Sequence, residues 1–226
     1  MRLNADFTRR AFAHATEADW VASPMPGVTR RMLDRIGDEV ARATSIVRYA
    51  PGSSFSPHTH DGGEEFVVLE GVFQDEHADY PAGFYVRNPP ASRHTPASAE
   101  GCTIFVKLHQ FDPADRKTVH VDASASKPWA VAGREGVAQV SLYEDAREQV
   151  RIEHWAPGQA VALADHAGLE VFVLDGAFAE AGEAFVRHSW LRLPPEQPLA
   201  AQAGPDGARV FVKSGHLAQA MSGADA

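Results

Sequence analysis

The chain has 226 residues, of which 44% are hydrophobic and 23% are charged, a balance typical of globular proteins rather than of disordered chains. Its formal net charge is −9 and it has no block rich in lysine or arginine, so we expect neither nucleic acid nor a membrane as a partner. No apolar run is long enough for a transmembrane helix, and residues 1–15 lack the apolar core of a secretory signal. With a single cysteine, Cys102, the chain forms no intrachain disulfide, and we expect it to be cytoplasmic.

The sequence contains an internal repeat. The first half carries the segments VRYAPGSSF, FVVLEGVF, RNPP and IFVKL, and the second half carries EHWAPGQAV, VFVLDGAF, RLPP and VFVKS in the same order. Each pair is separated by 105 or 106 residues. Four matched blocks in one order and at one spacing indicate a duplicated domain.

Both halves are expected to consist of short β-strands. Apolar, β-branched stretches at 43–49, 65–70 and 103–108 are typical of strands, and similar stretches recur in the second half. Gly71 and Gly176 each follow an acidic residue between apolar runs, which predicts tight hairpins with positive φ at glycine. No segment has an apolar stripe of helical period over three turns, so the fold class is all-β.

The repeat also suggests domain boundaries. The segment from Phe111 to Pro128 contains Asp, Ser and Pro without hydrophobic periodicity, as in a linker. We therefore expect an N-terminal domain at 1–111, a connector at 112–128 and a C-terminal domain at 129–226. Two such domains in one chain mimic a dimer, and further pairing of chains into a homodimer through edge strands stays open.

Four polar residues of the first half have the spacing of a metal site. His58 and His60 lie two positions apart on a predicted strand, so their side chains point to the same face. Glu64 follows a short loop onto the next strand, and His94 arrives from a separate strand. Three imidazoles and a carboxylate suit Fe, Mn, Ni, Cu or Zn and leave one or two coordination positions free. We expect one divalent transition metal per chain, with Zn or Fe ahead of Mn or Ni.

The order G-x5-H-x-H-x3-E-x6-G followed by G-x5-P-x4-H resembles the two-motif signature of the cupin superfamily. Within cupins, the segments HTHDGGEEFVVLEGVFQDE, YPAGFYVRNPPASRH and GCTIFVKL resemble the cupin domain of ChrR-type anti-sigma factors. The resemblance implies two tandem barrels of the double-stranded β-helix, or jelly-roll, type. It also implies that the metal ligands are His58, His60, Glu64 and His94.

Two positions depart from this pattern or leave it ambiguous. Ala91 stands where many cupins have glycine, which concerns a turn and no ligand. Glu65 is an alternative to Glu64, because some cupins place the carboxylate one residue later. The spacings on both sides of Glu64 fit the signature and favour that residue.

The second half lacks the complete ligand set. Aligned on the shared Ala-Pro-Gly and Pro-Pro segments, its equivalents of the four residues are, in order, Ala164, His166, Glu170 and Leu199. Here Glu170 matches the Glu64–Glu65 pair after a deletion of one residue. Two ligands of four are missing, so we expect a degenerate second cupin without metal, its former site filled by Ala164 and Leu199.

Five further side chains of the first half are candidates for the surroundings of the metal. Cys102 shares strand parity with Ile104, so it either faces the metal, with a redox role, or is an ordinary core residue. The other four lie on predicted strands and either hold an anionic ligand or face solvent: Arg48, Tyr85, Arg87 and Lys107.

Three functions are compatible with these features. ChrR-type anti-sigma factors join this cupin domain to a zinc-binding domain with a His/Cys cluster, which this sequence lacks, so we do not expect a sigma factor as partner. The first function is a metal-dependent sensor of a small molecule or of oxidative stress. The alternative is a non-haem dioxygenase that cleaves a hydroxyketone or diketone, similar to dihydroxyacetophenone dioxygenase, with Glu64 as ligand or base. A purely structural metal ranks lowest, because closed structural sites favour thiolate ligands.

Overall fold

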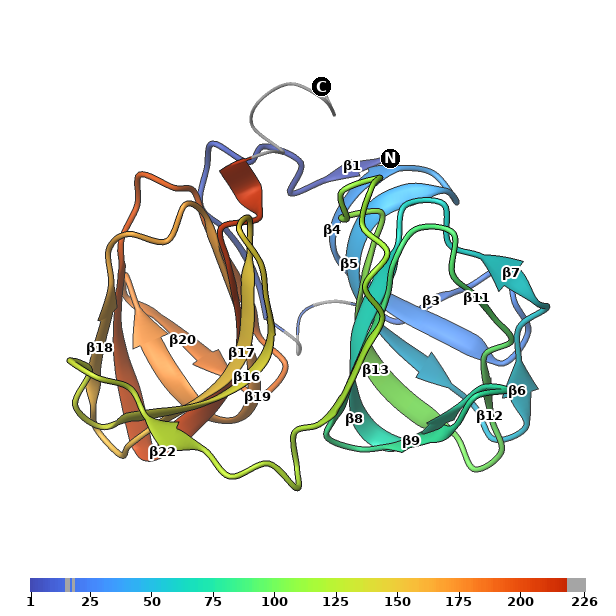
Figure 1. Ribbon diagram of the computed structural model, residues 1–226. Coiled ribbons are helices and arrows are strands. Elements are labelled where there is room, and N and C mark those ends of the chain that lie inside the picture. The colour runs from blue at the N-terminus through green and yellow to red at the C-terminus, as the bar shows by residue number, and fades with distance from the viewer. Residues whose placement is uncertain (15–16, 18, 219–226) are drawn as a thin grey trace. The chain divides into compact units, whose positions relative to one another are not determined.

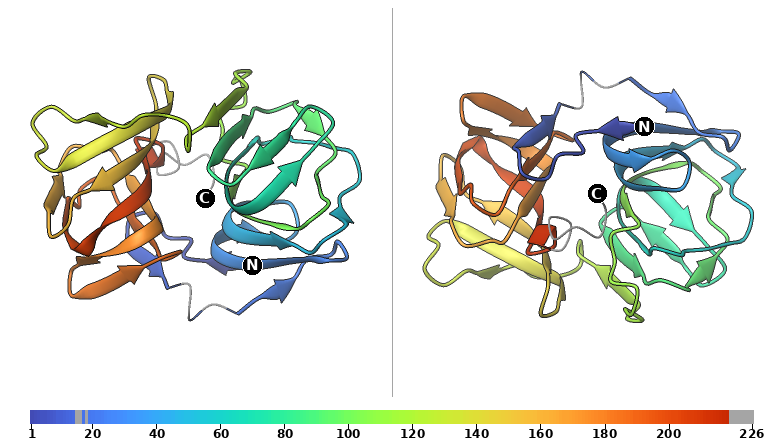
Figure 2. Two further views of the ribbon diagram at one scale, coloured as in Figure 1. Left: turned by 90° about the horizontal axis from the view of Figure 1, so that it is seen from below. Right: turned by 90° about the horizontal axis from the view of Figure 1, so that it is seen from above.

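The computed structural model describes residues 1–14, 17 and 19–218, and it confirms the all-β class (Figure 1). The chain forms two compact units. The first comprises residues 1–5 and 18–125, and the second comprises 6–17 and 126–226. Seen from below and from above in Figure 2, the strands of each unit curve around an interior, as in a barrel.

The first unit has five long strands: β4 (Val28–Gly37), β5 (Ala41–Tyr49), β8 (Glu64–Gln74), β10 (Phe84–Asn88) and β13 (Cys102–Leu108). Its shorter strands are β1 (Arg2–Leu3), β3 (Val21–Ala22), β6 (Ser53–Ser54), β7 (His58–Thr59), β9 (Asp79–Pro81), β11 (Arg93–His94), β12 (Ala97–Ser98) and β14 (Val119–Asp122). The main antiparallel sheet runs in the order β1-β4-β5-β13-β8-β10-β14, and β7 and β11 form a separate two-stranded sheet.

The two ends of strand β8 pair with different sets of strands. Its first half pairs with β13 and β10, whereas its last residues pair with β9 and β12. The prediction of a hairpin at Gly71 is wrong, because β8 continues through that residue and only bends there. Gly71 has φ of 72°, and a Cβ at this position would collide with the carbonyl oxygen of Gly101. Glycine is therefore needed for a close approach of two backbones.

Alternation along β8 and β13 builds the core of the first unit. Phe66 and Val68 of β8 and Ile104 and Val106 of β13 are buried and belong to one apolar cluster. The ring of Phe66 lies 4.5 Å from that of Phe73, centroid to centroid. Burying each such side chain stabilises the fold by about 1.5–3 kcal/mol. The same alternation turns Glu64 towards this interior, because it shares the parity of Phe66 and Val68.

The second unit repeats this arrangement. Its strands are β2 (Ala11–Ala13), β15 (Trp129–Ala130), β16 (Val137–Glu144), β17 (Gln149–Trp155), β18 (Ala160–Leu163), β19 (Leu169–Glu180), β20 (Glu183–Val186), β21 (Trp190–Leu193) and β22 (Leu199–Ser214). They follow the order β15-β16-β17-β22-β19-β21-β2, with β18 on β22 and β20 on β19. The predicted hairpin at Gly176 is likewise absent, since β19 bends through it with φ of 71°.

The structure divides the chain differently from the expected boundaries of 1–111, 112–128 and 129–226. Residues 6–17 group with the second unit, because β2 pairs with the edge of β21 and Arg10 forms a salt bridge of 2.7 Å with Glu180. The expected connector contains β14, which pairs with β10. A segment from outside the repeat thus extends the sheet of each unit, β14 in the first and β2 in the second. Such pairing uses backbone groups, so it leaves no pattern in the sequence.

Among the residues that the structure describes, no helix is long and apolar enough to span a membrane.

Candidate metal centre

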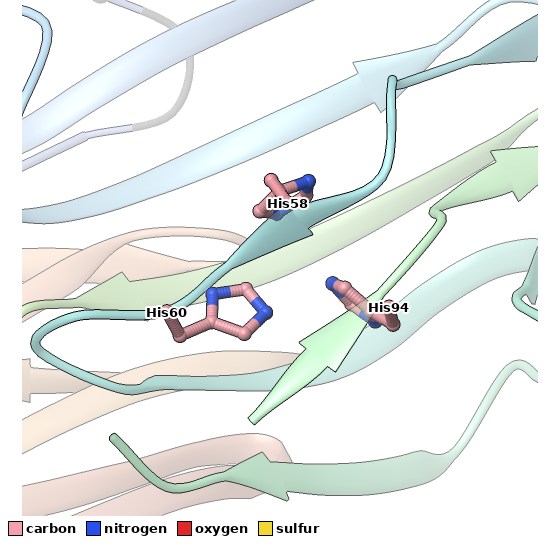
Figure 3. A group of neighbouring side chains, drawn as sticks. All are labelled: His58, His60 and His94. Carbon is pink, nitrogen blue, oxygen red and sulfur yellow. The ribbon is translucent and has the colours of Figure 1, made fainter. Parts of the chain in front are cut away.

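Three imidazoles meet inside the first unit, two from a pair of short strands and one from the residue that follows one of them (Figure 3). His58 lies on β7 directly opposite His94 on β11, and His60 follows the end of β7. One ring nitrogen from each residue lies within 4.8 Å of the other two. This distance is short enough for a single ion to be coordinated by all three, so the three histidines could hold a metal.

Glu64 joins this group from the first residue of β8. Its Oε2 atom lies 3.5 Å from Nε2 of His60 and 3.4 Å from Nε2 of His94. The side-chain amide of Asn88, the residue opposite it on β10, donates a hydrogen bond of 3.2 Å to the same oxygen. The structure therefore brings together all four residues that the sequence singled out.

Glu65 points to the opposite face of β8. Its Oε2 accepts a hydrogen bond of 2.7 Å from the hydroxyl of Tyr85, and its neighbours in the strand register are Arg87 and Lys107. Of the two adjacent carboxylates, only Glu64 faces the imidazoles. Strand alternation is the physical reason, since consecutive side chains project to opposite faces.

The chemistry of the site fits a metal cation. Nε2 of His60 and Nε2 of His94 are buried and have no hydrogen-bond partner among the described residues. An unsatisfied buried polar atom costs about 1–3 kcal/mol, and a bound cation would satisfy both nitrogens at once. Imidazole and carboxylate together suit a divalent first-row transition metal.

Asp75 holds the far side of His94, a role that the sequence analysis missed. Its Oδ2 lies 3.2 Å from Nδ1 of His94, and its Oδ1 accepts hydrogen bonds from the backbone N–H groups of His77 and Ala78. A carboxylate on the remote nitrogen orients the ring and leaves Nε2 for the ion. No spacing signals this pair, because 19 residues separate the partners.

The two buried imidazoles have opposite pKa shifts. Burial lowers the pKa of His60 more than the charge of Glu64 raises it. At His94 burial also lowers the pKa, but the hydrogen bond to Asp75 and the charge of Glu64 outweigh it and raise the pKa overall. A metal ion binds the neutral ring, so binding would displace a proton that His94 holds more firmly than an ordinary histidine does.

Two of the three histidines, His58 and His60, open onto a cavity of about 480 Å³ in the first unit. His58, His60 and Glu64 line part of it. Most of the remaining wall is apolar and comprises Met25, Val28, Val47, Tyr49, Phe55, Ile104, Val106 and Leu108. A cavity of this size and lining is typical of small-molecule sites.

The second unit has leucines where the first has ligands. Leu199 lies opposite Leu163 in the register of β18 and β22, as His94 lies opposite His58, and Leu169 begins β19 as Glu64 begins β8. All three pack in or against one apolar cluster. The equivalent of His58 is therefore Leu163 and not the predicted Ala164, because the strand register, rather than a constant offset, determines which residues face each other.

The two polar residues retained in the second unit have other partners. His166 accepts a hydrogen bond of 3.0 Å from the backbone N–H of Gly168 at Nδ1, and its Nε2 donates to the carbonyl of Gln197 at 2.9 Å. Glu170 lies opposite Lys213, as Glu65 lies opposite Lys107, so it is the equivalent of Glu65 rather than of Glu64. Within the described part of the chain, the cluster of the first unit is the one group of this kind.

The other candidate side chains do not line the cavity. Arg48 stacks on Trp20 at 4.0 Å, Tyr85 binds Glu65, and the remaining two are engaged elsewhere, Arg87 with Asp115 at 2.6 Å and Lys107 with Thr44 at 2.9 Å. Cys102 belongs to the apolar core, and burial raises the pKa of its thiol to about 11. Such a thiol is a poor nucleophile, so Cys102 is a packing residue.

Ala91 adopts the backbone conformation that its place in the motif predicts. Its φ is 71°, in the left-handed region that favours glycine, and it begins the turn that leads to β11. Its N–H donates a hydrogen bond to the carbonyl oxygen of His60, which ties this turn to the ligand strand. The departure from glycine thus stores strain in a turn and leaves the ligands in place.

Comparison with known proteins agrees with this description. The ChrR cupin-like domain family matches residues 8–112. No curated protein sequence matches the chain. Among similar solved structures, a candidate dioxygenase from Nostoc punctiforme has 16% sequence identity and a TM-score of 0.76, and the match covers 92% of this chain and 82% of that one. A nickel(II) complex of a bacterial pirin from Escherichia coli has 14% identity and a TM-score of 0.69, with coverage of 91% and 98%. A cupin 2 conserved barrel domain protein from Leptotrichia buccalis has 12% identity and a TM-score of 0.57, with coverage of 86% and 91%.

At these identities the solved structures show a shared fold and nothing finer. The family match, by contrast, spans the strands that carry all four candidate ligands and most of the cavity wall. Residues 8–112 are therefore similar to the ChrR cupin-like domain family, and the chain as a whole shares the fold of these solved structures.

Proposed function

We propose that this protein binds one divalent transition metal per chain through His58, His60, Glu64 and His94, and that the metal takes part in binding a small molecule in the adjoining cavity. The observation that carries the proposal is the pair of buried Nε2 atoms of His60 and His94, which have no hydrogen-bond partner in the described part of the chain and lie next to a cavity of about 480 Å³.

The residues around the site are arranged to keep the donor atoms in place. When bound, the metal supplies a Lewis acid with coordination positions left for a ligand. Asp75 and the carbonyl of Ser56 engage the remote nitrogens of His94 and His58, at 3.2 and 3.0 Å. Asn88 orients the carboxylate of Glu64. The apolar wall of the cavity excludes water and selects a molecule with an apolar part.

We favour a sensor of a small molecule or of oxidative stress over a purely structural metal site. A structural site is closed by its protein ligands, whereas His58, His60 and Glu64 line a cavity. The match of residues 8–112 to a ChrR cupin-like domain supports the sensor role.

A dioxygenase is the second candidate, and the position of Glu64 favours it. Its carboxylate lines the cavity and lies within 3.5 Å of two imidazoles, where it can either ligate the metal or accept a proton from a bound substrate. The candidate dioxygenase from Nostoc punctiforme shares the fold over 92% of this chain. The substrates to test are hydroxyketones and diketones.

Elemental analysis of the untagged protein, purified without added metal, tests the shared part of the proposal. We expect one metal per chain in the wild type, loss of nearly all of it in His58→Ala, and retention in His166→Ala, the matched control from the second unit. Retention in His58→Ala, or two metals per wild-type chain, would overturn the assignment. Oxygen uptake by the iron-loaded protein with a hydroxyketone then separates the dioxygenase from the sensor.

A further inference from the structure

One part of the cavity wall is charged and is not used by the metal site. Arg30 and Arg35 of β4 and Glu39 of the turn after it line the cavity together with the apolar side chains. The strand register between β4 and β5 shifts by one residue between Met32 and Asp34. This irregularity allows Arg35, an odd number of residues after Arg30, to reach the same face of the strand.

The two guanidinium groups are compensated unequally. Arg30 donates hydrogen bonds of 3.3 and 3.1 Å to the carboxylate of Glu39. Arg35 is 4% exposed, and its Nη2 donates to the backbone carbonyls of Asp38 and Glu39. No carboxylate among the described residues forms a salt bridge with Arg35. Backbone carbonyls carry no net charge, so a buried cation remains without an anion in direct contact.

The charges near Arg35 explain why an anionic ligand would stabilise its buried guanidinium. Burial lowers the pKa of its guanidinium, and the positive charge of Arg30 lowers it further, although Glu39 and Asp38 act in the opposite direction. Arginine stays protonated in proteins, so this wall presents two cations and one carboxylate. The carboxylate of Glu39 is 64% exposed and screened by water. Counted over Arg30, Arg35 and Glu39, and leaving Glu64 to the metal site, this part of the wall has a surplus of one positive charge, which one monovalent anion would balance.

We propose that the cavity binds a small monocarboxylate with an apolar body. Its carboxylate accepts hydrogen bonds from Arg35, with Arg30 beside it, and its body packs against the apolar wall that includes Val47 and Phe55. A guanidinium matches a carboxylate with two parallel hydrogen bonds. At roughly 30 Å³ for a water-sized group, the volume of about 480 Å³ holds about 15 non-hydrogen atoms. This inference rests on the proposed function, because it names the ligand class of the same cavity.

Calorimetric titration of the metal-free protein with two isosteric probes tests the proposal. The probes are 3-phenylpropionate and its uncharged analogue 3-phenylpropionamide. We expect the carboxylate to bind between about tenfold and a hundredfold more tightly, since hydrogen bonds to charged groups contribute that much. In Arg35→Gln the carboxylate should lose this advantage while the amide binds as before. Arg48→Gln, which removes an arginine outside the cavity, should change neither affinity.

Other results would overturn the proposal. It fails if the two probes bind wild type equally, if neither binds, or if Arg35→Gln keeps the preference for the carboxylate. It also fails if that preference appears only in metal-loaded protein, because the metal and not the arginine would then hold the carboxylate. If Arg35→Gln does not fold, Arg30→Gln replaces it, and an unchanged preference there counts against the proposal. Metal content is measured separately, so a protein without metal would refute the proposed function and leave this result standing.

Discussion

Replacing Asp75 by asparagine should weaken metal binding although Asp75 touches no metal. The side chain of Asp75 is 3% exposed and accepts three hydrogen bonds, one from His94 on Oδ2 and two from the backbone of His77 and Ala78 on Oδ1. Asparagine offers one oxygen in place of two and carries no charge. It therefore loses either the bond to His94 or those that hold its own loop.

The expected loss of metal affinity follows from the role of a carboxylate that binds the remote nitrogen of a ligating histidine. Removing the carboxylate behind a ligating histidine costs about 10–100-fold in metal affinity, equal to about 1.4–2.7 kcal/mol. Loss of the negative charge should also lower the pKa of His94 towards its ordinary value. The pH below which the metal affinity begins to fall should therefore shift downwards in Asp75→Asn.

Competition with a chromogenic chelator for Zn²⁺, measured over a range of pH, would detect both changes. The control is Asp79→Asn, which removes a nearby carboxylate that binds Gln74 at 2.8 Å and does not contact the histidines. An Asp75→Asn affinity equal to that of the wild type at every pH would refute the reasoning, because the carboxylate would then have no influence on the ligand nitrogen.

The remaining predictions concern pH, the thiol and the core. In the wild type, metal affinity should fall as pH decreases through the pKa of His94, which the hydrogen bond to Asp75 and the charge of Glu64 raise above that of an ordinary histidine. A metal affinity that does not change with pH in this range, measured by the same competition, would contradict the site. Cys102 should react slowly with iodoacetamide, and chelation should not change the rate, because its thiol is in the core and not in the cavity; faster alkylation after chelation would place it at the metal. Phe66→Ala should lower the free energy of unfolding by about 3–5 kcal/mol in urea titrations, and a loss below about 1 kcal/mol would show that Phe66 is not a core residue.

Much of the metal site could be predicted from sequence because its determinants are local. His58 and His60 share a face through the two-residue period of a strand, and Glu64 follows them after a short loop. His94 is more distant, but its place is set by a second motif of fixed spacing. The same spacings favoured Glu64 over Glu65, and the structure gives the reason, since Glu65 projects to the other face and binds Tyr85.

The sequence by itself determined the all-β class, the repeat and the four residues that meet in the first unit, because each rests on periodicity or on short spacing. Only the tertiary structure placed Asp75 behind His94 and put Leu163 opposite Leu199. It also brought Arg35 to the cavity through a shift in strand register, and paired residues 11–13 with β21. These contacts depend on the register between strands, which is set by backbone hydrogen bonds that every residue except proline can make, and so they leave no signature in the side chains.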